Sequence, residues 1–342
     1  MAANYWHSTQ CHRWLLESTE IEAAREEDRR YADSHEILAI STWCLDTIIT
    51  LAKRLQLRQR VVATASVYFQ RFYIHNSYAA TDPILVLVTC VYVASKVEES
   101  PVRIRTFCAE AAKMMSEWGY KDLPNSVSMI AEMEFFLLEE LEFDLVVFHP
   151  YSSLPHLCQA CLAHRPPQRG GRPAPHVYAE DGDHAKSDSL LQVCWLIVND
   201  MYRTSLPLEQ PPYMLAIASL YLAVILHPTT AEHIYDATYT NEQSMATDDV
   251  VSFLAGLNVS LPMVTRIVQQ MMAHYTLWHE LSLPATNTRI AFTDHAAMFQ
   301  RLYRMRNDRY KALLLIDGGA HTLSTLAAPS YDLPDTPQRL AA

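Results

Sequence analysis

Glycine is scarce in this chain, with seven in 342 residues. Five of the seven fall in two short stretches, at 170–182 and 318–319, so only Gly119 and Gly256 remain for the rest of the chain. A phosphate-binding loop or a dinucleotide-binding turn needs several closely spaced glycines, and both kinds of site are therefore excluded. Turn signals of β-hairpins are equally rare. The sequence thus predicts an all-α fold, and we expect no cofactor.

The chain also lacks long apolar runs, paired cysteines and an excess of positive charge. Its longest apolar runs, at 84–94 and 214–226, are too short to span a bilayer, and the N-terminus has no secretory signal. Seven cysteines stand mostly singly in apolar segments, which is typical of reduced core residues in an intracellular protein. The formal net charge of −11 argues against non-specific nucleic-acid binding. We expect no membrane partner and no direct nucleic-acid partner.

What is present is a series of helical segments, organised around one that runs from Asp82 to Pro101. Asp82 can cap the N-terminus of this helix, and Pro83 suits the first helical position. Pro101 forbids continuation, so the helix must stop near residue 100. Residues 84–94 are apolar on all sides apart from one threonine, which is typical of a helix surrounded by other helices.

The last turn of this central helix is charged, because it contains Lys96, Glu98 and Glu99. A lysine is favourable at this negative end of the helix dipole, whereas each acidic side chain there costs roughly 0.3–1 kcal/mol. A local rule broken at the end of a buried helix indicates a functional site.

The length of the chain predicts two helical domains, each large enough for its own core. In the first, we expect five helices, at 34–54, 57–74, 83–100, 104–115 and 126–145. Composition and periodicity predict an N-terminal helix and charged strut at 1–33, a first unit at 34–150, a linker with a disordered loop at 151–186, a second unit at 187–281, and a partly disordered C-terminal extension at 282–342 that holds an Arg-rich helix at 294–315.

The two units are related by an internal repeat. Four positions recur 129 residues later, where Tyr73, Pro83, Tyr92 and Ala94 are matched by Tyr202, Pro212, Tyr221 and Ala223. The charged positions do not recur, since Lys96, Glu98 and Glu99 are matched by Ile225, His227 and Pro228. The repeated positions therefore define a scaffold, and the charges of the first copy serve another purpose.

The expected partner of Lys96 is Glu134 on the fifth helix. The neighbours of Glu134 at helical spacing include Ile130, Leu138 and Leu141, so its carboxylate borders the apolar side of the helix. A semi-buried carboxylate needs a cation, and Lys96 is the natural candidate. We predict an ion pair that orders the local surface; the alternative is a solvated glutamate.

Two clusters allow more than one interpretation. The aromatic residues Tyr5, Trp6 and Trp14 either pack on the core of the chain or anchor a partner protein. The Arg-rich helix either presents a solvated face, which we favour, or contacts an acidic partner or nucleic acid. Its basic residues are Arg301, Arg304, Arg306 and Arg309.

Two motifs could carry chemistry, but neither is complete. Cys158 and Cys161, flanked by His156 and His164, lack a second cysteine pair at zinc-ribbon spacing, so we favour two core thiols on one face of a short helix and expect no metal. Asp294 and His295 could belong to a hydrolase, but no companion cluster surrounds them. The sequence therefore shows no arrangement of nucleophile and base that would mark an active site, although an all-helical hydrolase remains an alternative.

The segment Ala-Ser-Lys-Val-Glu-Glu at 94–99 ends the third helix of a duplicated five-helix unit, and in this it resembles the cyclin family. The Asn-Tyr-Trp…Trp pattern at 4–14 and the stretches 57–73, 149–151 and 197–204 are similar to the cyclins of the Mediator kinase module. The resemblance covers about residues 1–162 and 187–281. It implies two tandem five-helix cyclin boxes, at 34–150 and 187–281, with an extra N-terminal helix.

The resemblance further implies a nuclear, non-catalytic subunit that binds and activates a Mediator-associated cyclin-dependent kinase in RNA polymerase II transcription. Other subunits of the Mediator kinase module are implied as partners. Glu98 and Glu99 are expected to face basic groups of the kinase. The residues implied to bind the kinase are Lys96, Glu134, Val97, Glu98, Glu99, Leu138, Phe143, Leu145, Tyr5, Trp6 and Trp14.

Two points qualify the resemblance. Cell-cycle cyclins dock substrate peptides through a motif whose arginine is missing from the corresponding stretch, 40–45, so we do not expect docking of that type. A duplicated cyclin fold also occurs in proteins similar to general transcription factor IIB, which bind promoter DNA. That alternative requires a basic surface and an N-terminal zinc ribbon, whereas this chain is acidic and has no N-terminal pair of Cys-x-x-Cys motifs.

Overall fold

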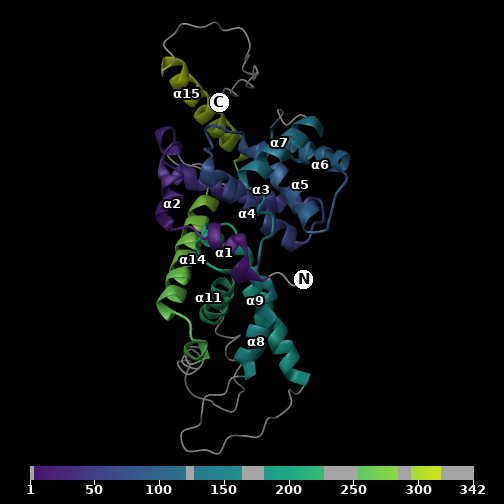
Figure 1. The fold of residues 1–342 in the computed structure, drawn as a ribbon, viewed down its shortest axis with the longest axis vertical. Helices are drawn as coiled ribbons and strands as arrows, with labels where there is room; N and C mark the ends of the chain where they lie inside the picture. The colour runs from purple at the N-terminus through teal and green to yellow at the C-terminus, as the bar shows by residue number, and fades with distance from the viewer. Residues whose placement is uncertain (1–3, 121–126, 164–180, 227–252, 284–293, 317–342) are drawn as a thin grey trace, which may run out of the picture.

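The structure, a computed structural model, describes residues 4–120, 127–163, 181–226, 253–283 and 294–316, and within them it contains helices and no strand (Figure 1). The expected all-α fold is therefore confirmed. The main helices are, in chain order, η1 (Tyr5–His7), α1 (Thr9–Arg13), α2 (Ser18–Ala23), η2 (Asp28–Arg30), α3 (Ser34–Arg54), α4 (Gln59–His75), α5 (Pro83–Val97), α6 (Ile104–Glu117), α7 (Val127–Glu140), η3 (Pro150–Ser152), α8 (Leu154–Ala163), α9 (Asp181–Met201), α10 (Leu206–Glu209), α11 (Pro212–Leu226), α14 (Leu261–Ser282) and α15 (His295–Ile316).

The predicted central helix is α5, and it is surrounded as expected. The Asp82 carboxylate accepts a hydrogen bond from the Ile84 amide at 3.0 Å, and Pro83 occupies the first turn. Helices α3, α4, α6 and α7 all pack against α5. Burial on every side explains why its sequence has no polar stripe before Ser95 apart from Thr89.

Several helices end in a turn that usually requires glycine but here uses other residues. At the end of α5, the Ser100 amide donates to the Ser95 carbonyl at 2.9 Å, and Glu99 adopts a φ of 52°. Gln56 and Glu142 follow α3 and α7 in the same left-handed conformation, at φ 54° and 51°. Because glycine did not mark these turns, the sequence placed the end of α7 at residue 145, five residues too late.

The internal repeat is confirmed by helices α5 and α11. Both contain 15 residues and start at a proline, and their bounds are displaced by the 129 positions predicted from the sequence. Helix α11 packs against α8, α9 and α14, as α5 packs against its own neighbours. Side chains from both units form one continuous hydrophobic core.

The stretch between the two predicted units contains a helix that packs on the second unit. Helix α8 lies within the stretch interpreted as a linker, but it packs on α9 and α11. Cys158 and Cys161 are fully buried on it, in keeping with the expected core thiols, so its apolar face belongs to the core of the second unit. His164 and most of the predicted disordered loop lie outside the described residues.

The N-terminal segment is more tightly bound to the body than a solvated strut. Instead of a single helix before the charged stretch, it forms the short helices η1 and α1, and the Leu16 amide donates to the Leu208 carbonyl of α10 at 2.8 Å. Asp28 in the charged stretch is fully buried and accepts a hydrogen bond from the Ser77 hydroxyl at 2.8 Å. The segment therefore joins the two units.

Helix α15 occurs where the sequence predicts an Arg-rich helix, but the helix also has a buried apolar side that the sequence analysis did not predict. Met298, Leu302 and Met305 are buried, and together they form one stripe of the helix. This stripe packs on the first unit, where the Phe299 ring lies 5.4 Å from the Trp43 ring of α3. Arginines between the apolar positions concealed this stripe in the sequence.

Candidate functional site

The predicted ion pair between Lys96 and Glu134 is present, and it joins the end of α5 to α7. The Lys96 ammonium also lies 4.7 Å from the centre of the Tyr92 ring, an additional cation–π contact. The Lys96 side chain is 38% exposed and that of Glu134 is 19% exposed. The pair is thus half-buried at the surface, where it holds two helices in register.

Large apolar side chains next to this pair are exposed to solvent. Phe135 follows Glu134 in α7 and is 75% exposed, and Phe143 and Val146 beyond the end of α7 are 70% and 58% exposed. Large apolar side chains exposed in one region of a protein usually mark a binding site for another protein. We call this surface the docking face and define it by Lys96, Val97, Glu134, Phe135, Leu138, Phe143, Leu145 and Val146.

Two side chains of α4 bind the backbone of the segment that presents Phe143 and Val146. The Arg71 guanidinium donates to the Asp144 carbonyl at 3.0 Å, and the Tyr68 hydroxyl donates to the Leu145 carbonyl at 2.5 Å. Burial lowers the pKa of Arg71 to about 10. The two anchored carbonyls lie between Phe143 and Val146 in the chain, and the side chains of these two residues remain exposed.

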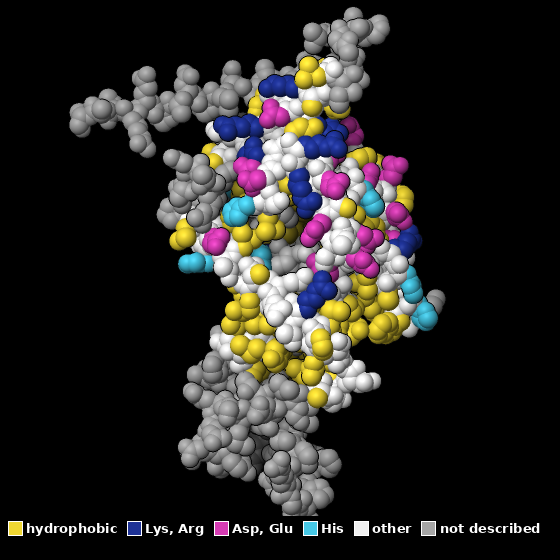
Figure 2. All heavy atoms as spheres, turned by 90° about the vertical axis from the view of Figure 1, so that its left-hand side faces the viewer, with side chains coloured by type: hydrophobic (Ala, Val, Ile, Leu, Met, Phe, Trp, Pro, Cys, Tyr) yellow, Lys and Arg dark blue, Asp and Glu magenta, His cyan; other side chains and the backbone are white. Residues whose placement is uncertain are grey.

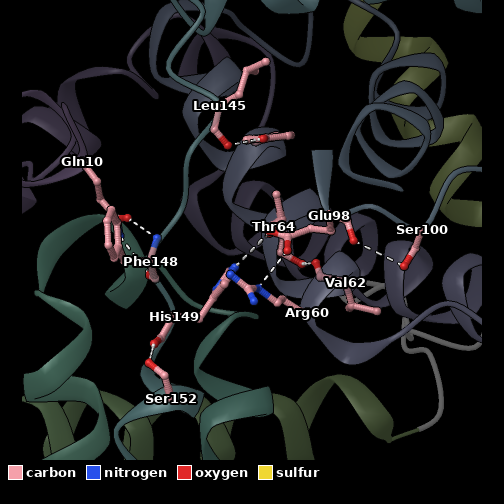
Figure 3. Close-up of polar contacts among 12 residues, drawn as sticks. Gln10, Arg60, Val62, Thr64, Glu98, Ser100, Leu145, Phe148, His149 and Ser152 are labelled. Carbon is pink, nitrogen blue, oxygen red and sulfur yellow. Dashed lines mark hydrogen bonds and ion pairs between the residues drawn. The ribbon is translucent and has the colours of Figure 1, made fainter. Parts of the chain in front are cut away.

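The N-terminal segment holds the same turn from its other side. The Gln10 side chain accepts a hydrogen bond from the Phe148 amide at 2.6 Å and donates to its carbonyl at 3.3 Å, a contact visible in Figure 3. Arg13 forms ion pairs with Glu142 and Asp144. These contacts were not foreseen, because neither Gln10 nor Arg13 stands in a recognisable motif.

The three N-terminal aromatic residues have different environments. Trp14 is only 4% exposed, its indole donates to the Asp144 carboxylate at 2.9 Å, and the Arg71 guanidinium lies 4.7 Å from its ring. The expectation that Trp14 contacts a partner directly is therefore wrong, since its surface is used internally. Tyr5 packs against Phe148, with ring centroids 5.6 Å apart. Trp6 is 58% exposed and remains available.

The sequence analysis expects Glu98 to face basic groups of the kinase. In the structure, the Glu98 carboxylate instead makes its polar contacts within the chain. It accepts a hydrogen bond from the Thr64 hydroxyl at 2.7 Å, pairs with the Arg60 guanidinium at 2.8 Å, and lies 3.9 Å from the His149 imidazole (Figure 3). Burial acts to raise the pKa of Glu98, but these three contacts outweigh it and the pKa falls below its usual value. The charge at the helix end is balanced within the chain.

His149 extends this polar cluster to the second unit. One ring nitrogen lies 2.8 Å from the Thr64 hydroxyl and the other lies 2.5 Å from the Tyr202 hydroxyl, which follows α9. The imidazole is buried, and burial lowers its pKa despite the nearby Glu98. The sequence placed Glu98 at a functional surface because it could not show that α4 and the 149–152 turn meet there.

The other residues implied to bind the kinase are half-buried or exposed. Val97, Leu138 and Leu145 are half-buried, packed on the core with part of each side chain accessible. Glu99 is exposed, and so are Glu132 and Glu139 on α7. The docking face is therefore apolar at its centre and acidic around it. Sequence analysis missed Phe135 and Val146, although the apolar pair Phe135–Phe136 beside Glu134 signals a second apolar side of α7.

The motifs with possible chemistry serve packing. His295 stacks on Trp118, with ring centroids 3.9 Å apart, and its Nδ1 accepts a hydrogen bond from the Trp43 indole at 3.1 Å. The Cys158 thiol lies 3.9 Å from that of Cys194 inside the second unit. Within the described ranges, no cluster of three or more potential metal ligands occurs, and no helix is long and apolar enough to cross a membrane.

Two tandem helical units around α5 and α11, with an ion-paired lysine at the end of α5 only, define a cyclin. The family described as "Cyclin, N-terminal domain" matches residues 14–146. A chain of the CAK complex of Chaetomium thermophilum has the same fold, with a TM-score of 0.55 and 16% identity, over 96% of this chain and 98% of that one. A chain of the yeast TFIIK complex gives a TM-score of 0.52 at 20% identity, over 72% and 97%.

Relatives in sequence are more specific. The RNA polymerase II holoenzyme cyclin-like subunit of Mycosarcoma maydis is 36% identical, over 92% of this chain and 98% of its own length. Cyclin-C of Drosophila melanogaster is 33% identical, over 82% and 91%. The chain therefore belongs to the cyclin family, in the group of cyclin C and the RNA polymerase II holoenzyme cyclin-like subunits. It is a non-catalytic kinase regulator, which decides against the alternative resembling factor IIB.

Proposed function

We propose that this protein binds a Mediator-associated cyclin-dependent kinase through the docking face and activates it in RNA polymerase II transcription. The observation that carries the proposal is the combination of a fixed ion pair, Lys96–Glu134, with exposed Phe135, Phe143 and Val146. Large aromatic side chains around a fixed charge pair are typical anchors of protein interfaces. The name of the Mycosarcoma maydis relative, a subunit of the RNA polymerase II holoenzyme, supports the same assignment.

The chemistry of the docking face favours an amphipathic helix with basic residues as its ligand. The apolar centre would receive the hydrophobic side of such a helix. The surrounding glutamates, among them Glu99, Glu132 and Glu139, would attract its cationic side chains. In the cyclin family the matching surface holds the mobile αC helix of the kinase. Binding in one orientation biases that helix toward the position in which the Lys–Glu ion pair of the kinase forms.

Of the residues implied by the resemblance, we retain nine as kinase contacts and reassign two. Glu98 and Trp14 are positioning residues, because their side chains are used inside the chain. Trp6 is a second contact point, where its ring lies 5.6 Å from that of Tyr213 at the junction of the two units. The retained contacts are Lys96, Glu134, Val97, Glu99, Leu138, Phe143, Leu145, Tyr5 and Trp6.

The test is a charge reversal with a matched control in the second copy. Lys96→Glu places a second acidic side chain beside Glu134, and the two carboxylates repel each other. We therefore expect the Kd for the kinase to rise about tenfold or more. Ile225 occupies the same position of α11, is 43% exposed, and lies outside the docking face. Ile225→Glu is therefore expected to leave the Kd unchanged. The Kd values of both variants are measured by biolayer interferometry, after confirming that their melting temperatures equal that of the wild-type chain.

A double variant separates the ion pair from a general charge effect. Lys96→Glu combined with Glu134→Lys restores a pair of opposite charges at the same place. We expect it to recover part of the affinity that either single variant loses. An unchanged Kd for folded Lys96→Glu would contradict the proposal.

The proposed partners and location are tested together by affinity purification from nuclei. We expect a cyclin-dependent kinase and other subunits of the Mediator kinase module to co-purify, with the protein concentrated in the nucleus. We expect no direct binding to duplex DNA and none to membranes. Salt-sensitive DNA binding in a mobility-shift assay would count against this part of the proposal.

A further inference from the structure

The loop between α5 and α6 contains a serine that is followed directly by a proline. Among the 18 prolines of the chain, only two come directly after a serine or threonine, at Ser100–Pro101 and Thr336–Pro337. Both hydroxyl residues have an arginine three positions later, Arg103 and Arg339. Lys and Arg together make up 27 of the 342 residues, so chance alone rarely places one at both positions.

A hydroxyl residue, a proline next to it and an arginine at the third position form a pattern that proline-directed protein kinases recognise. Proline has no amide hydrogen, so a kinase pocket without an acceptor at this position selects it. The arginine adds a charge contact with an acidic or phosphorylated group of the kinase. Thr336 lies outside the described residues, whereas Ser100 lies inside them.

The structure leaves Ser100 within reach of such an enzyme. Residues 100–103 belong to no helix or turn, and Pro101 and Arg103 are exposed. Ser100 itself is half-buried, and its hydroxyl donates to the Glu98 carbonyl at 3.4 Å, which is long for a hydroxyl donor (Figure 3). The hydroxyl therefore loses little when it leaves this contact.

The turn that leads into Ser100 is strained. The Ser100 amide donates to the Ser95 carbonyl at 2.9 Å, and this closes the turn over Glu99. Glu99 has a φ of 52°, a left-handed conformation that is unfavourable for any residue except glycine. Opening of the turn relieves this strain and exposes the hydroxyl of Ser100.

We propose that Ser100 is phosphorylated by a proline-directed protein kinase, and that the phosphate opens the last turn of α5. In this reaction the Ser100 Oγ attacks the γ-phosphorus of ATP, and the bond between that phosphorus and the leaving oxygen of ADP breaks. The hydroxyl proton passes to the catalytic base of the kinase. The product carries a charge of about −1.5 to −2 at pH 7.

Charges on both sides of the phosphate act in the same direction. Glu98, Glu99 and the negative end of the α5 dipole repel it. On its other side lies Arg103, the N-cap residue of α6, and this N-terminus has no side-chain cap hydrogen bond. The positive end of α6 and the arginine attract the phosphate. Ser100 is therefore drawn from the end of α5 toward the start of α6.

The effect of the phosphate is local. Acidic and basic side chains are interspersed over the upper part of the face that Figure 2 shows. At physiological ionic strength, exposed charges more than about 8 Å apart are largely screened from each other. The phosphate acts on the turn beside it, which also contains Lys96. Looser pairing of Lys96 with Glu134 lowers the affinity of the docking face, a consequence that rests on the proposed function.

The site is tested with the full chain, ATP and a purified cell-cycle cyclin-dependent kinase, which is proline-directed. We expect mass spectrometry to locate phosphate on Ser100. Arg103→Ala is expected to slow this phosphorylation at least tenfold, whereas the matched control Arg105→Ala, also at an exposed arginine, leaves the rate unchanged. A chain without phosphate on Ser100 would overturn the proposal. A synthetic peptide of residues 94–107 then tells whether the fold hides the serine or the kinase does not recognise the motif.

The opening of the turn is tested on a chain with Thr336→Ala, in which Ser100–Pro101 is the one remaining step of its kind. We expect the amides at 96–100 to exchange hydrogen at least tenfold faster after phosphorylation, while the amides of α11 keep their rates. Unchanged exchange at 96–100 would show that the phosphate does not open the turn. This readout involves no kinase binding, so it does not depend on the proposed function.

Affinity for the kinase of the proposed function is measured on the same phosphorylated chain, beside Lys96→Glu. We expect both to raise the Kd at least fivefold. A higher Kd for Lys96→Glu alone would refute the effect of the phosphate on docking. An unchanged Kd for both would instead refute the docking face, and the phosphorylation and exchange results would still decide on Ser100.

Discussion

Helices α5 and α11 are two copies of one element, and they differ in charge only where the helix ends. Both begin at a proline, contain 15 residues and are buried among their neighbours. In α5 the last turn holds Lys96 in an ion pair and leads directly into Glu98. In α11 the matching turn ends with Ile225 and Leu226, which are 43% and 40% exposed and uncharged.

This difference shows which positions a fold requires and which a function requires. The buried positions of both helices are apolar or small because each unit must fill its core. The second copy folds with isoleucine, Ile225, at the position that matches Lys96, so the stability of the unit does not require a lysine there. The two charged residues of the first copy have different roles. Lys96 lies at the exposed docking face, whereas Glu98 joins α5 to α4 and to the turn before the second unit.

The largest expected effect tests whether the two copies are equivalent as scaffold. Leu87 of α5 and Leu220 of α11 are both fully buried. We expect Leu87→Ala and Leu220→Ala each to lower the free energy of unfolding by about 3 kcal/mol, from lost burial and the cavity left behind. Urea denaturation followed by circular dichroism measures both. Leu196→Ala is the control, because Leu196 is mostly exposed and its loss changes stability little.

One continuous core predicts a single unfolding transition for all three chains. If Leu220→Ala instead separated a second transition from the first, the two copies would be independent in stability.

The next effect separates the two neighbouring glutamates of the first copy. Glu98→Ala removes the acceptor of Thr64 and the partner of Arg60, so we expect the free energy of unfolding to fall by about 2 kcal/mol. Glu99→Ala is the matched control, since Glu99 is exposed, and is expected to leave stability unchanged. Thermal denaturation gives the comparison. A Glu98→Ala variant as stable as the wild-type chain would show that the polar cluster contributes nothing.

The smallest effect concerns two buried histidines, His149 between the units and His274 in α14. Burial lowers the pKa of both, that of His274 to about 4. In each case the unfolded chain binds a proton at higher pH than the folded chain, so stability is lost as the pH falls below about 6.5. From pH 7 to 5.5 we expect a loss of about 1 kcal/mol from His274.

Comparison of the wild-type chain with His274→Phe isolates this contribution, because the carboxylates titrate equally in both. Urea midpoints at the two pH values provide the measurement. The variant is expected to lose about 1 kcal/mol less than the wild-type chain on acidification. Equal losses in the two chains would mean that His274 accepts its proton in the folded state.

Much of the fold followed from local patterns. The capping pair of Asp82 and Pro83, the helix α3 at 34–54 and the repeat of α5 as α11 were all predicted correctly. The ion pair of Lys96 with Glu134 was also predicted, because a carboxylate beside an apolar stripe needs a nearby cation. These features depend on neighbours within one or two helical turns, or on one pair of packed helices.

The errors about single polar and aromatic side chains share a physical cause, which is contact between segments far apart in the chain. Glu98, Trp14 and Arg301 are polar or aromatic groups that the sequence places at a surface. Each is neutralised or covered by a residue at least 30 positions away, such as Thr64, Asp144 or Glu36. Hydrophobic periodicity contains no information about such partners.

The sequence by itself thus determined an all-helical, duplicated scaffold in which one copy carries added charge. Helix periodicity, capping residues and scarce glycine are sufficient for that, because they act locally. Only the tertiary structure decided which of those charges remain outside. Packing brings Arg60, Thr64 and His149 around Glu98, and it leaves Lys96, with Phe135, Phe143 and Val146, at the surface.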